Sequence, residues 1–152
     1  MKKILVSACF LGDKVRYDGK QKTLNHPIIQ KWLAEDRLVS VCPEVAGGLP
    51  VPRPAAEIST LNGKVQTSQK IDVSLFFQNG ADIALQICKK HNIHHALLKE
   101  SSPSCGSNNV YDGTFSGKKI SGVGKTTELL RKHGIDVYSE LTIERLITTL
   151  VE

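Results

Sequence analysis

Residues 42–57 carry four of the six prolines in the chain. Proline fixes φ and has no backbone N–H donor, so this stretch can form neither the interior of a helix nor a central strand. It begins with Cys42 and Glu44, directly after the apolar run 38–41, and it carries Arg53 further on. We expect a stiffened loop that forms the wall of a functional site. A proline-rich surface connection with incidental charges is the alternative.

The size and composition of the chain predict a single domain spanning residues 1–152. It is 40% hydrophobic and 23% charged, which is typical of a globular protein. A domain of about 150 residues buries roughly 70% of its unfolded surface, so it needs no disulfide. No apolar run approaches the ~20 residues of a membrane helix, and the basic N-terminus leads into a short strand rather than a signal peptide. We expect a cytoplasmic protein with reduced cysteines.

The net charge of +5 would suit an anionic substrate or a nucleic acid. However, the lysines are spread along the chain without a block, and aromatic residues make up only 5% of it. Surfaces that bind single strands usually combine basic and aromatic residues. The sequence therefore favours a small molecule over a nucleic acid or a membrane as the partner, and it leaves the oligomeric state open.

Short apolar runs typical of buried strands alternate with helical patterns. Strands are predicted at 4–6, 38–41, 94–98 and 136–138, and helices from Pro27, over 72–91, over 126–133 and after Thr142. Asn62-Gly63 predicts a type I′ hairpin, and residues 111–115 a second hairpin. This order predicts a three-layer α/β/α fold: a Rossmann-like parallel sheet of about four strands with two small hairpin appendages.

Three of the four cysteines follow predicted strands. Cys9, Cys42 and Cys105 come at or shortly after a carboxyl strand end, and in an open parallel sheet these ends form the ligand crevice. We therefore expect the three thiols to meet in one place. Cys88 lies on the apolar face of a predicted helix, where a small buried hydrophobe is expected.

Three converging thiols allow several chemistries. They could bind zinc, hold an iron–sulfur cluster, or include a catalytic nucleophile with a resolving partner. Cys-x-x-Cys pairs, which mark zinc ribbons and common redox sites, are absent from the sequence. An open three-cysteine site is the better interpretation, and three thiols that are merely buried or unrelated to one another are the alternative.

Several motifs occur together in an order that resembles the thiouracil desulfurase (TudS) family. They are Ser7-Ala8-Cys9, Val15-Arg16-Tyr17-Asp18-Gly19, Cys42-Pro43-Glu44-Val45 with Gly47-Gly48-Leu49-Pro50, Pro52-Arg53-Pro54, and Ser102-Pro103-Ser104-Cys105-Gly106. The resemblance covers nearly the whole chain. It implies a 4Fe-4S cluster that is bound by three cysteines and has a fourth iron free to take sulfur from a thiolated pyrimidine.

The resemblance also implies residue roles. Cys9, Cys42 and Cys105 match the cluster ligands, and Glu44 and Ser102 match the proposed catalytic carboxylate and hydroxyl. The expected function is desulfuration of a 2-thiouracil-like base with water supplying the oxygen; the alternative is a metal- or cluster-containing binding or sensing module without this activity. For Glu44 the other interpretation is an ion pair with Arg53, and for Ser102 it is a turn hydroxyl.

Overall fold

Four short strands form a parallel sheet with the order β2-β1-β5-β8. They are β1 (Ile4–Ser7), β2 (Leu38–Val41), β5 (His95–Leu97) and β8 (Asp136–Tyr138) in a computed structural model that describes residues 1–20 and 23–151. The central strand β1 is buried along its whole length. The edge strand β2, predicted to be buried, has only Val41 fully covered, because one side of it has no neighbouring strand.

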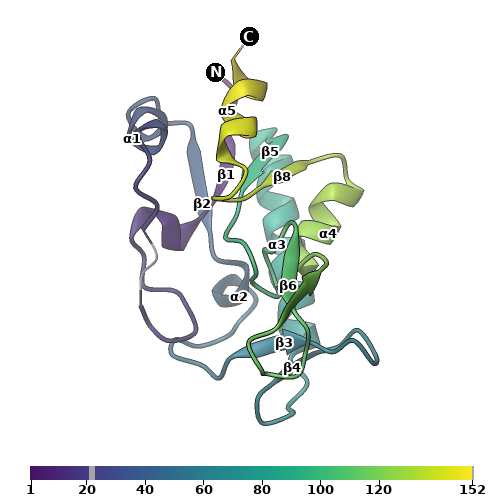
Figure 1. The fold of residues 1–152 in the computed structure, drawn as a ribbon. Helices are drawn as coiled ribbons and strands as arrows, with labels where there is room; N and C mark the ends of the chain where they lie inside the picture. The colour runs from purple at the N-terminus through teal and green to yellow at the C-terminus, as the bar shows by residue number, and fades with distance from the viewer. Residues whose placement is uncertain (21–22, 152) are drawn as a thin grey trace.

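Helices cover both faces of the sheet (Figure 1). On one face, α1 (Pro27–Ala34) and α5 (Ile143–Leu150) pack against alternate side chains of β1. On the other face, α3 (Ser74–His91) and α4 (Lys125–Lys132) share a second core with the intervening β1 residue, Leu5. Since successive strand residues point to opposite faces, β1 contributes to both cores, and the predicted three-layer α/β/α arrangement is confirmed.

The helix ends explain why these segments stop where they do. Pro27 occupies the first turn of α1, where a missing N–H costs little. The His26 side chain accepts a hydrogen bond from the Ile28 N–H over 3.1 Å. Asn92 ends α3 in the left-handed conformation, with φ of 54°, a conformation that asparagine adopts at helix ends more readily than most residues.

Two antiparallel hairpins extend from the sheet. One pairs β3 (Ala56–Ile58) with β4 (Val65–Thr67), and the other pairs β6 (Asn109–Tyr111) with β7 (Lys119–Ser121). The predicted type I′ turn is wrong, since the pairing of Ile58 with Val65 leaves 59–64 as the connection. Of Asn62 and Gly63, only Gly63 has a positive φ, whereas a type I′ turn needs two.

The proline-rich stretch 42–57 is only partly a loop. It opens with a one-turn helix, α2 (Pro43–Ala46), and it ends inside β3. The expectation of a continuous loop is wrong for these ends because Pro43 occupies the first turn of α2, the one part of a helix that tolerates proline. Residues 47–55 form the expected irregular wall.

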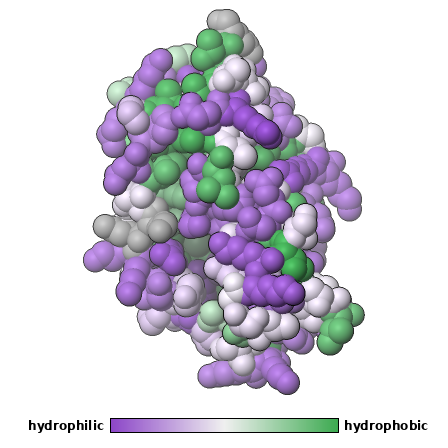
Figure 2. Space-filling view, in the orientation of Figure 1, coloured by the Kyte–Doolittle hydropathy of each residue, from purple (hydrophilic) through white to green (hydrophobic). Residues whose placement is uncertain are grey.

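None of the helices described over 1–20 and 23–151 is long and apolar enough to cross a membrane. On the face seen in Figure 2, hydrophilic residues prevail and hydrophobic ones occur in smaller groups. In Figure 1 the two chain ends lie at the same end of the molecule, away from α2 and the hairpins.

Candidate functional site

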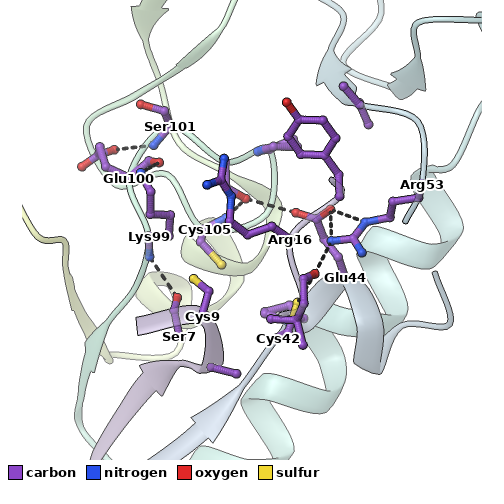
Figure 3. Close-up of a pocket in the computed structure, with 18 of the residues that line it drawn as sticks. Ser7, Cys9, Arg16, Cys42, Glu44, Arg53, Lys99, Glu100, Ser101 and Cys105 are labelled. Atoms are coloured by element: carbon purple, nitrogen blue, oxygen red, sulfur yellow. Dashed lines mark hydrogen bonds and ion pairs between the residues drawn. The ribbon is translucent and has the colours of Figure 1, made fainter. Parts of the chain in front are cut away.

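Cys9, Cys42 and Cys105 line one cavity of about 320 Å³ at the carboxyl ends of the strands. Cys9 lies in η1 (Ala8–Leu11), a single 3-10 turn that directly follows β1. Cys42 directly follows the neighbouring strand β2, and Cys105 lies in the loop after β5. Their expected convergence is therefore observed, and Figure 3 shows the Cys9 and Cys105 sulfur atoms pointing toward one another.

All four cysteines are free thiols. Burial, followed by the neighbouring Cys42, raises the pKa of the Cys9 thiol to about 11. Burial is also the main reason why the pKa values of Cys42 and Cys105 are raised. For Cys105, the neighbouring Cys42 and Glu44 raise the pKa further. Cys88 does not line the cavity and is buried on the core face of α3, as predicted.

The loop that carries Cys105 is held against α4. The Thr127 hydroxyl of α4 donates to the Cys105 carbonyl over 2.8 Å. At the start of this helix, Gly124 approaches so closely that a Cβ there would collide with the Ser104 backbone. Gly124 thus allows the start of α4 to pack on the loop that carries Cys105. This packing fixes the position of the Cys105 thiol at the cavity.

Glu44, in the first turn of α2, contacts Ser102 and Arg53 through different carboxylate oxygens. The Ser102 hydroxyl donates to Oε2 over 3.3 Å. Arg53 binds Oε1 through Nε and Nη2, each at 3.1 Å. The two residues with implied catalytic roles therefore lie in contact, and the expected alternative pairing of Glu44 with Arg53 is present as well.

Ser102 also forms the turn expected under its alternative interpretation. Its oxygen accepts hydrogen bonds from the N–H groups of Ser104 at 3.0 Å and Cys105 at 3.2 Å. These contacts occupy the acceptor positions of the hydroxyl and leave its proton for Glu44. The turn therefore directs the hydroxyl, so the structural and the functional interpretations are compatible.

Arg53 connects the proline wall to the loop after η1. Its side chain is only 4% exposed. It donates from Nη1 to the Pro50 carbonyl and from Nη2 to the Val15 carbonyl, both at 3.0 Å. The sequence indicated that Arg53 pairs with Glu44. It did not indicate the hydrogen bond to Val15, because the two residues lie 38 positions apart and no local sequence pattern predicts that they meet.

The second hairpin brings residues to the cavity that sequence reasoning missed. Tyr111 and Lys119 line it from β6 and β7, with the Lys119 amine 5.5 Å from the centre of the Tyr111 ring. The buried Glu57 carboxylate of β3 accepts the N–H groups of Gly113 and Phe115 at 3.0 and 3.1 Å. This contact joins the two hairpins. The only feature of the sequence that could have indicated it is the presence of a carboxylate next to a strand.

The donor set fits an iron–sulfur cluster better than a single metal ion. Thiolates are soft ligands that suit iron–sulfur clusters and zinc. Across residues 1–20 and 23–151, no three His, Cys, Asp or Glu side chains lie close enough together to hold one metal ion. Three thiols that line one cavity are a donor set that a larger group such as an iron–sulfur cluster would use.

The chain is a three-layer α/β protein, and three thiols line the cavity at the ends of its strands. This fold and this site define a class of proteins that can hold an open iron–sulfur cluster. The sequence pattern of the family described as 2-thiouracil desulfurase matches residues 4–142. The chain belongs to this family, which confirms the resemblance.

Two relatives support the assignment. A solved structure of the [4Fe-4S]-dependent thiouracil desulfidase TudS is 49% identical, with a TM-score of 0.95, and the match covers 99% of this chain and 98% of that one. The uncharacterized protein YbbK of Bacillus subtilis (strain 168) is 43% identical over 145 residues, covering 90% of this chain and 95% of the relative. Both matches extend over nearly the whole chain.

Proposed function

We propose that this chain, acting as a single domain of residues 1–152, is a [4Fe-4S]-dependent desulfidase of thiolated pyrimidines such as 2-thiouracil. The observation that carries the proposal is the shared cavity, in which three thiols lie beside the contacting pair Glu44 and Ser102. The 49% identical desulfidase supports the activity and the cofactor. The four free thiols are consistent with a reducing compartment, and we place the protein in the cytoplasm.

Cys9, Cys42 and Cys105 would hold the cluster as thiolates. When bound, the cluster supplies an iron atom with an open position, a Lewis acid for the thiocarbonyl sulfur of the substrate. Since burial favours the protonated thiols, loading the cluster would release protons from them. Cys88 has no part in this site.

Glu44 Oε2 is the atom that would exchange protons with the pyrimidine ring and the attacking water. Ser102 holds its own proton toward this oxygen and would relay a proton or donate a hydrogen bond. Their separation of 3.3 Å exceeds the usual 2.5–3.0 Å for O–H···O bonds. Catalytic hydrogen bonds often tighten only when substrate binds, so this length is compatible with a proton-transfer role.

Arg53 would keep Glu44 in place by occupying Oε1, which leaves Oε2 for proton transfer. The guanidinium is anchored by two carbonyls and is almost fully buried. Because low local polarity strengthens such contacts, the carboxylate would hold one orientation throughout the reaction.

The cavity favours a small substrate. About 320 Å³ is at the lower end of the roughly 300–1,000 Å³ usual for small-molecule sites. The absence of a lysine block in the sequence also argues against a nucleic-acid partner. Competition experiments with the free base, the nucleoside and thiolated tRNA would rank these possible substrates.

The test is sulfide release from 2-thiouracil and other thiopyrimidines after anaerobic reconstitution, with metal-free protein as the control. We expect equal amounts of sulfide and oxygenated base. A protein with an intact cluster that releases no sulfide from any thiopyrimidine would instead be a binding or sensing module. A colourless, iron-free product of careful reconstitution would argue against the cluster itself.

A further inference from the structure

The loop of residues 101–109, which carries Ser102 and Cys105, encloses the carboxylate of Glu100. Glu100 is only 3% exposed. Six hydrogen bonds of 2.8 to 3.3 Å reach its two oxygens. The donors are the backbone N–H groups of Ser101, Ser107, Asn108 and Asn109, the Ser107 hydroxyl and the Asn108 side-chain amide. One buried charge thus joins the first and last residues of the loop.

Glu100 is itself fixed to the edge of the sheet. Its N–H donates to Oε1 of Glu140 over 2.8 Å, and Oε2 of Glu140 pairs with the Lys99 amine, also at 2.8 Å. On the other side, the Lys99 N–H donates to the hydroxyl of Ser7, two residues before Cys9, over 2.9 Å (Figure 3). The base of the loop is therefore held in register with the strand that delivers Cys9.

Ser101 adopts a left-handed backbone conformation with φ of 70°. This conformation is costly for a residue with a side chain and persists only where its surroundings enforce it. Here the Ser101 N–H donates to Oε1 of Glu100, and its hydroxyl donates to Asn109. Ser101 points away from the cysteines in Figure 3, whereas the next residue, Ser102, contacts Glu44.

We propose that Glu100 is a positioning residue that holds the Ser102 hydroxyl and the Cys105 thiol at the cavity by binding the backbone N–H groups that precede and follow them in the loop. Its carboxylate is turned into the loop, away from the thiols (Figure 3), so it acts through other residues. The consequence for catalysis rests on the proposed function; the placement of the loop does not.

The test is the alkylation of each cysteine in the metal-free protein by iodoacetamide, followed by mass spectrometry. Glu100→Gln keeps the shape but loses the charge, and its amide nitrogen replaces an oxygen that faces Asn108. We expect alkylation of Cys105 to accelerate about tenfold, since hydrogen bonds to a charged group are among the stronger ones. Glu100→Ala should accelerate it further, whereas Cys88 should keep its wild-type rate.

Glu35→Gln is the control, because it removes a carboxylate that pairs with Arg37 and does not line the cavity. It should leave the Cys105 rate unchanged. An unchanged Cys105 rate in Glu100→Gln, or equal acceleration of Cys88 and Cys105 through general unfolding, would overturn the inference.

Hydrogen exchange of the wild-type protein provides a measurement that needs no variant. The amides of Ser107, Asn108 and Asn109 should be protected although they lie in or beside a loop, and rapid exchange at all three would contradict the inference. Neither measurement needs turnover. A protein that releases no sulfide but shows the selective Cys105 effect would refute the proposed function and support the role of Glu100.

Discussion

The Ser102 hydroxyl donates to Oε2 of Glu44 over 3.3 Å, although 58 positions separate the two residues in the chain. Arg53 binds the other oxygen of this carboxylate. Two backbone N–H groups fill the acceptor positions of the hydroxyl. The Ser102 proton is therefore directed at one oxygen of Glu44, which defines the atom where proton transfer is expected.

Glu44→Gln should lower kcat for sulfide release by about 10²–10⁴-fold, the usual contribution of a positioned acid or base, because an amide cannot exchange this proton. Iron content should stay at the wild-type value. Glu35→Gln is the matched control, since it removes a carboxylate paired with Arg37 outside the cavity. Wild-type turnover per cluster in Glu44→Gln would exclude Glu44 as the proton-transfer group.

Arg53→Met should lower the free energy of unfolding by about 3 kcal/mol, because removing one partner of a buried ion pair leaves the other charge uncompensated. Urea unfolding followed by circular dichroism measures the change. Arg16→Met removes the more exposed pair with Asp18 and should cost less than about 1 kcal/mol. Equal losses in the two variants would show that Arg53 is not a structural anchor.

Cys105→Ser should abolish stable cluster retention, since hydroxyl oxygen is a much poorer ligand for these irons than thiolate sulfur. Cys88→Ser should keep wild-type iron and acid-labile sulfide after anaerobic reconstitution, because Cys88 lies on the buried face of α3 and does not line the cavity. If both variants lost the cluster equally, the assignment of Cys105 as a ligand would be wrong.

Glu100 should contribute to the acid sensitivity of the fold. Burial alone would raise the pKa of this carboxyl, but hydrogen bonds led by that from the Asn108 N–H outweigh burial and lower it from 4.5 to about 2. The unfolded chain therefore binds the proton at a higher pH than the folded protein does. The stabilisation, about 3 kcal/mol, is complete above about pH 5 and is lost as the pH falls toward 2.

Urea unfolding of the wild type and of Glu100→Gln at a series of pH values measures this contribution. The difference in unfolding free energy between the two proteins should be constant above about pH 5 and shrink as the solution becomes more acidic. A difference that is independent of pH down to 3 would contradict the assigned shift.

The alternation of strands and helices was sufficient to predict the sheet and the meeting of Cys9, Cys42 and Cys105. This inference succeeds because the carboxyl ends of parallel strands lie along one edge, whatever the detailed loop structure. The roles of these cysteines as ligands, and of Glu44 and Ser102 in catalysis, stay predictions that the variants above test.

Contacts between distant loops could not be predicted in the same way. Tyr111 reaches the cavity because Glu57 binds the turn of its hairpin, and this contact joins segments more than fifty positions apart. Glu100 likewise has no local pattern that distinguishes it from an exposed carboxylate. The type I′ turn predicted at Asn62-Gly63 was wrong although its local pattern is strong. A two-residue turn needs strands that pair on both sides of it, but the last pair of β3 with β4 is Ile58 with Val65.

Iron-edge anomalous scattering from crystals of the anaerobically reconstituted protein tests the three-cysteine cluster site most directly. We expect one compact iron signal in the cavity, within bonding distance of the sulfur atoms of Cys9, Cys42 and Cys105. Iron located elsewhere, or a protein that releases sulfide from 2-thiouracil with no iron in this cavity, would contradict the site and the mechanism built on it.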